Sequence, residues 1–135
     1  MTRTVAVNRQ IESLANMLSA ERDAVVQYIV HADANQTSLD VAYASTDRQL
    51  SAVRSKSAWP QFRPGDPPHV AGVEEFRSAL RDVRNRTLTT ARSPHANVSL
   101  ASLFIFYVDV NEFLLVSVAK TTQVVTQSFV FLTRA

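Results

Sequence analysis

A chain of 135 residues, of which 46% are hydrophobic and 19% charged, is long enough for one domain with a real core and too short for two, so we expect a single domain over residues 1–135. It has no cysteine, which excludes disulfides, thiolate nucleophiles and cysteine-ligated zinc. The net charge is only +2, and the apolar region from 103 to 119 is interrupted by Asp109, Asn111 and Glu112, so we expect a soluble protein rather than a membrane span.

The first half of the chain shows helical periodicity. Apolar residues recur at spacings of three, four and seven and predict a helix over about 8 to 31; they are Ile11, Leu14, Leu18, Val25 and Ile29. A polar break at 35–38 precedes a short second helix or turn around 39–43, and the segment 46–56 is interpreted as an edge strand.

A proline-rich loop and a third helix follow. Residues 59–68 hold four of the five prolines and Gly65, which predicts a loop with restricted φ angles. Its Trp59 and Phe62 could anchor a partner or simply pack over one end of the core. Apolar residues at spacings of three and four then predict a helix over 73–85; they are Val73, Phe76, Leu80 and Val83.

The C-terminal region is interpreted as β-structure. Strands are predicted at 87–92, 100–110, 113–121 and 123–133, with turns near 93–94, 111–112 and 121–122. Short connections favour an antiparallel meander. The expected fold class is α+β, with the N-terminal helices packed on a curved antiparallel sheet; a sheet closed into a barrel is the alternative.

Several residues carry a resemblance to a known family. Tyr28, Asp33, Leu39 and Tyr43 fall in the order of an N-terminal helical corner, Gly72 and Phe76 match the start of a third helix, and Phe129 matches a closing strand. On these residues the chain resembles the nuclear transport factor 2-like family, and most of all the small subunit of the heterodimeric messenger-RNA export receptor. The resemblance implies a non-enzymatic subunit of the nucleus and nuclear pore that shuttles to the cytoplasm and pairs with a partner of similar fold.

The pairing surface follows from strand alternation. One face of the sheet would be apolar and hidden by the partner, a heterodimer being expected over a homodimer. Where animal members of that branch carry an arginine, this chain has Val130. The predicted partner-binding residues are Phe104, Phe106, Val108, Leu114, Val116, Val118, Ser128, Val130 and Leu132.

Arginines outnumber lysines and gather between 54 and 92. Arginine suits bidentate contacts to phosphate or carboxylate, so this stretch could contact RNA or a partner, although a solvated helix face with a few ion pairs is the favoured interpretation. The candidate residues are Arg54, Arg63, Arg81, Arg84 and Arg86.

A small cavity enzyme or ligand binder of the ketosteroid isomerase type, acting as a homodimer, is the alternative function. The available side chains are Tyr28, His31, Asp33, Tyr43 and Tyr107. Asp33 would be the base, but a carboxylate at a helix end is more often a cap or a surface group. The three histidines are too scattered for a metal site, so neither catalytic residues nor a metal or cofactor are predicted.

Overall fold

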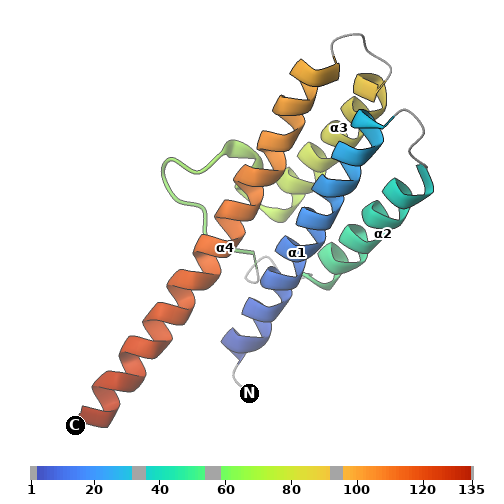
Figure 1. The fold of residues 1–135 in the computed structure, drawn as a ribbon. Helices are drawn as coiled ribbons and strands as arrows, with labels where there is room; N and C mark the ends of the chain where they lie inside the picture. Colours follow the sequence, from blue (N-terminus) through green and yellow to red (C-terminus); the bar gives the residue numbers. More distant parts are fainter. Residues whose placement is uncertain (1–2, 32–35, 54–58, 92–95, 135) are drawn as a thin grey trace.

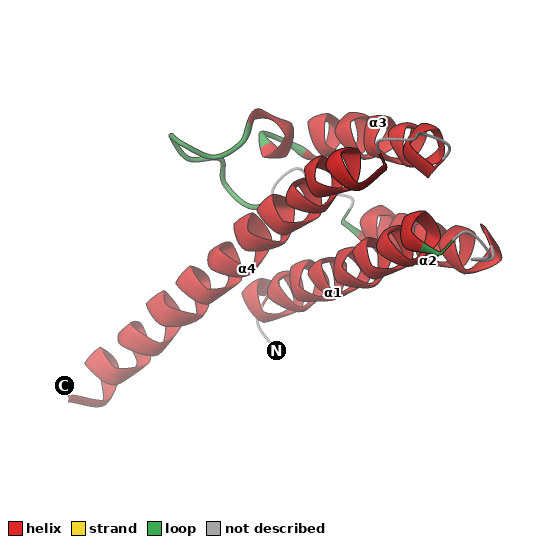
Figure 2. Ribbon diagram, turned by 45° about the horizontal axis from the view of Figure 1, so that its top comes forward, coloured by secondary structure: helices red, strands yellow, loops and turns green. Residues whose placement is uncertain are grey.

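The structure is a computed structural model that describes residues 3–31, 36–53, 59–91 and 96–134, with side chains from 9 to 119 within these ranges except at 96–99. Four α-helices account for most of it: α1 (Arg3–Val30), α2 (Gln36–Ala52), α3 (Val73–Ala91) and α4 (Ala96–Arg134) (Figure 1). A short 3₁₀ turn, η2 (Pro68–Val70), precedes α3. No residue of the described ranges lies in a β-strand (Figure 2).

The helices run alternately up and down as a bundle (Figure 1). Its central helix is α1, which packs against both α2 and α4, while α3 packs against α4 (Figure 2). The C-terminal part of α4 extends beyond the other three helices (Figure 1).

The helices predicted over 8–31 and 73–85 are confirmed by the core, whereas the short helix or turn predicted around 39–43 is part of the 17-residue helix α2. In α1, Ile11, Leu14, Leu18 and Val25 are buried and Ile29 packs against them, as the spacing predicted. The predicted apolar residues of α3, namely Val73, Phe76, Leu80 and Val83, are also buried. Both helices are longer than expected, since α1 begins at Arg3 and α3 continues to Ala91.

The prediction of an α+β fold is wrong. Residues 46–52 belong to α2 and not to an edge strand, residues 87–91 complete α3, and one helix of 39 residues replaces the strands at 100–110, 113–121 and 123–133. The predicted turns at 111–112 and 121–122 are helical, and the one at 93–94 lies outside the described residues.

The reason lies in the position of α4 between two neighbours. It contacts both α1 and α3, so apolar residues cover more than one side of the helix. The regular alternation of apolar and polar residues that marks a helix with one buried side is therefore weak in this part of the sequence. The fully buried residues Leu103, Tyr107, Val110 and Leu114 are nevertheless spaced by four, three and four, which is the period of a helix. Aromatic and β-branched side chains here pack in a helical core, because tertiary context overrides their preference for strands.

The proline-rich segment is a loop as predicted, and it closes one end of the core. Gly65 has a φ of 93°, the left-handed region that glycine adopts without strain. Trp59 is buried, donates its indole N–H to the carbonyl oxygen of Val70 at 2.9 Å and stacks on Phe76 with ring centroids 5.4 Å apart. Of the two interpretations of Trp59, packing over the core is therefore confirmed.

One segment of α4, Leu100–Ala119, is long and apolar enough to cross a membrane by length and composition alone. Core helices of globular proteins pass the same test. In this structure 39% of the segment is buried inside the bundle, where Tyr107 and Leu114 are fully enclosed.

Candidate functional site

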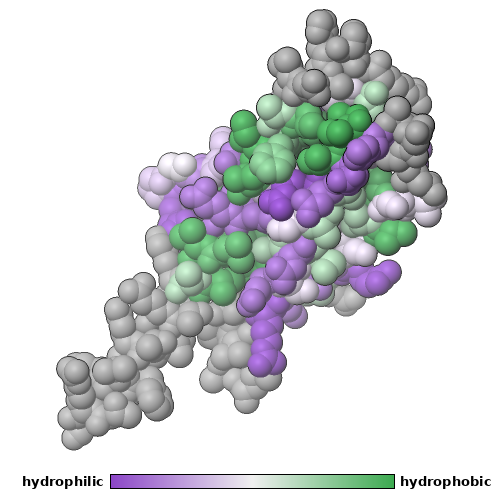
Figure 3. Space-filling view, viewed as in Figure 1, coloured by the Kyte–Doolittle hydropathy of each residue, from purple (hydrophilic) through white to green (hydrophobic). Residues whose placement is uncertain are grey.

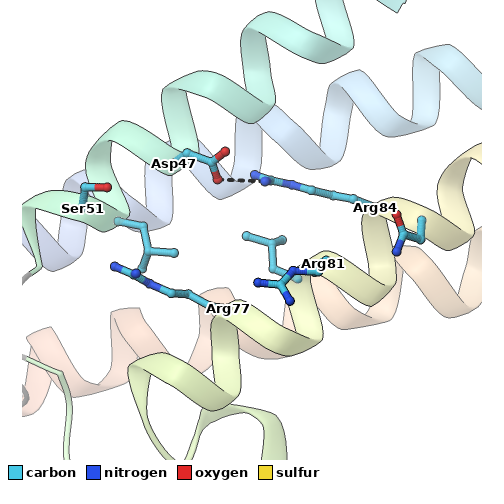
Figure 4. A pocket seen from close by; sticks show the side chains of 8 residues that line it. Asp47, Ser51, Arg77, Arg81 and Arg84 are labelled. Atoms are coloured by element: carbon cyan, nitrogen blue, oxygen red, sulfur yellow. Dashed lines mark hydrogen bonds and ion pairs between the residues drawn. The ribbon is translucent and has the colours of Figure 1, made fainter.

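A pocket of about 380 Å³ lies between α2 and α3. Arginines 77, 81 and 84 follow one another along α3 at spacings of four and three, which puts them on one face of the helix. They face α2 across the pocket (Figure 4). The full lining is Asp47, Leu50, Ser51, Arg77, Leu80, Arg81, Arg84 and Asn85.

Charge in this pocket is unbalanced. Three guanidinium groups line it against a single carboxylate, that of Asp47. The Nε atom of Arg77 is buried and has no hydrogen-bond partner. Three guanidinium groups against one carboxylate give the pocket an excess of positive charge, so it suits hydrogen-bond acceptors that carry negative charge.

Arg84 joins the pocket to the interior of the bundle. Its Nη1 donates to Oδ1 of Asp47 at 2.8 Å, at the pocket (Figure 4). Its Nη2 donates to Oε1 of Glu21 at 2.7 Å and to the carbonyl oxygen of Tyr43 at 3.3 Å. The guanidinium also lies 4.4 Å from the centroid of the Tyr43 ring, in cation–π geometry.

Glu21 is a carboxylate with no solvent exposure at all. Besides Arg84 it accepts a hydrogen bond of 2.5 Å from the hydroxyl of Tyr107. A buried charge is tolerated only when it is paired and hydrogen-bonded, and Glu21 is both. Burial by itself lowers the pKa of Arg84, but the hydrogen bonds and charges of Glu21 and Asp47 outweigh it and raise that pKa.

The same network ties together all four helices. Glu21 lies on α1, Tyr43 and Asp47 on α2, Arg84 on α3 and Tyr107 on α4. The position of one guanidinium, and so the shape of the pocket, depends on contacts from every helix of the bundle.

Two tyrosines of the network make stability sensitive to alkaline pH. Burial raises the pKa of Tyr43 to about 12, and burial together with the charge of Glu21 raises the pKa of Tyr107 further. The folded chain therefore keeps protons that the unfolded chain loses above pH ~10. We expect the free energy of unfolding to be unaffected by these groups below pH ~10 and to fall above it, by about 1.4 kcal/mol per pH unit for each tyrosine.

Urea denaturation between pH 8 and 11.5 measures this effect. The Tyr107→Phe variant, which has one titrating group fewer, should show a shallower decline than the wild-type chain. Parallel curves for the two proteins would contradict the assignment.

Two of the predicted arginine contacts, Arg81 and Arg84, lie together in this pocket. Arg63 instead pairs with Asp66 of its own loop at 3.3 Å, and Arg86 is exposed beside a different hollow. Arg54 lies outside the described residues. Sequence reasoning missed Arg77, although its spacing of four and seven from the other two on a predicted helix was a usable signal. It also missed Glu21, for which the sequence offers no comparable pattern.

The six predicted partner-binding residues whose side chains the structure describes do not form one face. These residues were chosen by the two-residue alternation of a strand, so on a helix they point in different directions. Phe106 and Leu114 are buried. Val116 and Val118 are half-buried, and Phe104 and Val108 are exposed. Phe104 lies beneath the guanidinium of Arg22, 5.3 Å from its ring centroid. The side chains of Ser128, Val130 and Leu132 lie outside the described residues.

Apolar surface does remain along α4. Hydrophobic side chains gather over that helix on the face seen in Figure 3, and its exposed large apolar residues are Phe104, Ile105, Val108 and Leu115. That a partner protein covers some of this surface stays a prediction.

The side chains of the isomerase hypothesis are dispersed. Tyr43 and Tyr107 belong to the Arg84 network, Tyr28 packs at the edge of the core and His31 is exposed after α1. Asp33 lies outside the described residues. In the part of the chain that the structure describes, no three histidine, aspartate or glutamate side chains could hold a metal ion together.

Comparison with known families gives a clear match. The family described as nitrate and nitrite sensing matches residues 13–130, which is most of the 135-residue chain. The chain belongs to this family. No curated protein and no solved structure matches this chain.

Membership in the nitrate and nitrite sensing family corrects the predicted identity. The resemblance to the nuclear transport factor 2-like family is wrong, because the family is different and the described residues contain no sheet. The role in messenger-RNA export, the location in the nucleus and nuclear pore, and the ketosteroid isomerase alternative are wrong with it. The predicted general class of function, a binding role rather than a catalytic one, agrees with membership in a family of sensing domains.

Proposed function

We propose that this chain is a sensory domain that binds nitrate or nitrite in the pocket between α2 and α3. The family match supplies the class of ligand. The excess of three arginines over one aspartate in the lining of this pocket is the observation that supports this location.

The chemistry of the pocket suits these anions. Nitrate is planar and spreads one negative charge over three oxygens, and guanidinium presents parallel N–H donors in a plane, so two edges can meet in a bidentate contact. Arginines on successive turns of α3 offer such donors from more than one direction.

The apolar part of the lining contributes to selectivity. Leu50 and Leu80 lie among the charged residues of the pocket. An anion that enters gives up water there, and that cost is smaller for singly charged, weakly hydrated nitrate than for sulfate. The pocket is therefore expected to prefer nitrate and nitrite to strongly hydrated anions.

Substitution of Arg77 or Arg81 tests this function. We expect Arg77→Gln and Arg81→Gln each to weaken nitrate binding about tenfold or more, because each removes a charge-assisted hydrogen bond. Isothermal titration calorimetry with sodium nitrate, at ionic strength held constant with sodium sulfate, measures the dissociation constants.

Arg86→Gln is the matched control. It makes the same change of charge on the exposed surface of α3, outside the pocket. Its affinity should stay within about twofold of wild type, because exposed charges separated by solvent are screened. Absence of nitrate binding by the wild-type chain, or an equal loss in the Arg86 variant, would refute this function for the pocket.

A further inference from the structure

The pocket already contains a carboxylate in contact with one of its arginines. Asp47 is the only acidic residue of the lining, and its Oδ1 accepts from Nη1 of Arg84 at 2.8 Å. A carboxylate and a nitrate present the same feature to guanidinium, two coplanar oxygens that share a negative charge. An anion that binds Arg84 from the pocket therefore competes with Asp47 for the same donor.

The two carboxylates on Arg84 differ greatly in how firmly they are held. Glu21 has a side-chain exposure of 0% and is bound by Arg84 and Tyr107. Asp47 has a side-chain exposure of 57% and makes a single contact with Arg84. Loss of Arg84 would leave the charge of Glu21 buried without a partner, which costs much free energy. The Asp47 side chain can instead rotate out into solvent at little cost in free energy. The incoming anion must therefore replace Asp47 and leave Glu21 in place.

We infer that Asp47 is a built-in competitor of the anion, and that ligand binding breaks the Asp47–Arg84 ion pair between α2 and α3. The inference rests on the proposed function of the same pocket. Glu21 and Tyr107 act as positioning residues that hold the Arg84 guanidinium at the pocket while its outer partner changes. Ligand binding thereby removes a link between α2 and α3, and it keeps the Arg84–Glu21 link from α3 to α1 and the Tyr107–Glu21 link from α4 to α1.

The Asp47→Asn variant tests the competition directly. It removes the competing charge and keeps the shape of the side chain, so we expect nitrate to bind about fivefold more tightly than to wild type, the value of one exposed ion pair. Asp40→Asn is the matched control, since Asp40 is an exposed aspartate of α2 that lies outside the pocket lining. Its affinity for nitrate should remain within about twofold of wild type.

Titration calorimetry on the three proteins separates this inference from the proposed function. Tighter binding by the Asp47 variant alone supports both. Binding by the Asp47 variant with none by the wild type supports the inference and refutes sensing by the wild-type pocket. Equal or weaker binding by the Asp47 variant, or equal gains in the Asp40 variant, overturns the inference while sensing stands. No binding by any of the three overturns both.

Hydrogen exchange measures the consequence for the helices. Saturating nitrate should speed exchange of α2 amides near Asp47 in the wild type, and the Asp47→Asn variant should show that faster exchange without nitrate. Amides of α4 near Tyr107 should be unchanged, because the Glu21 contacts persist. Slower or unaltered exchange in α2 at saturating nitrate would overturn the displacement of Asp47.

Discussion

Replacement of Arg84 by methionine should destabilise the folded chain by about 3–5 kcal/mol. Methionine fills similar space but leaves the carboxylate of Glu21, which has no solvent exposure, with Tyr107 as its remaining partner. The cost is that of an uncompensated buried charge rather than that of a lost surface ion pair. Urea denaturation followed by circular dichroism measures the change.

A double-mutant cycle isolates the cause. Adding Glu21→Gln to the Arg84→Met variant removes the stranded charge, so the double variant should be more stable than Arg84→Met alone. The control is Arg81→Met, because Arg81 lies on the same face of α3, is exposed, and forms no ion pair with Glu21. An Arg84 variant within about 1 kcal/mol of wild type would mean that Glu21 does not depend on Arg84.

Truncation of Phe76 to alanine should have a comparable effect, about 3–5 kcal/mol. Phe76 is fully buried and stacks with Trp59 at 5.4 Å and with Phe106 at 6.3 Å between ring centroids. The substitution removes apolar contacts and opens a cavity where the loop, α3 and α4 meet. Denaturation can be followed by the fluorescence of Trp59, the only tryptophan of the chain.

Leu88→Ala is the comparison on the same helix. Leu88 is 39% exposed, so its truncation should cost much less, about 1 kcal/mol or below. Equal losses for the two variants would show that Phe76 does not anchor the core.

The Arg84 network also bears on how the pocket should be tested. Arg84 supports the fold and lines the pocket, so its substitution changes both stability and binding. Arg77 and Arg81 line the same pocket without a bond to the buried Glu21. They are the variants that report on anion binding with the least disturbance of the bundle.

For the candidate site, the sequence alone indicated the residue type but not the place. Arginines are enriched between residues 54 and 92, and the arginine side chain suits planar anions, so the sequence pointed to the stretch that contains Arg81 and Arg84. Arg77 was predictable too, since it lies on the same face of a predicted helix. The partners of Arg84 were not, because Glu21, Asp47 and Tyr107 are separated from it by 63, 37 and 23 residues along the chain and share no motif with it.

For α4, the scarcity of turn residues indicated a helix, but the aromatic and β-branched composition was given more weight. No glycine or proline occurs after Pro94, and only two glycines occur in the whole chain, which is a poor supply for a four-stranded meander with tight turns. Aromatic and β-branched residues nevertheless suggested strands. The lack of turn-forming residues over this length favours one helix over several strands.

The sequence by itself therefore determined α1, α3 and the proline-rich loop, because each depends on spacing within a few residues, and it indicated arginine as the residue type of the candidate site. Only the tertiary structure decided the all-helical bundle of the described residues, the burial of Glu21 and the pocket between α2 and α3. Those features arise from contacts between helices that are distant in sequence. Local periodicity does not show which charged residue of one helix pairs with which charged residue of another.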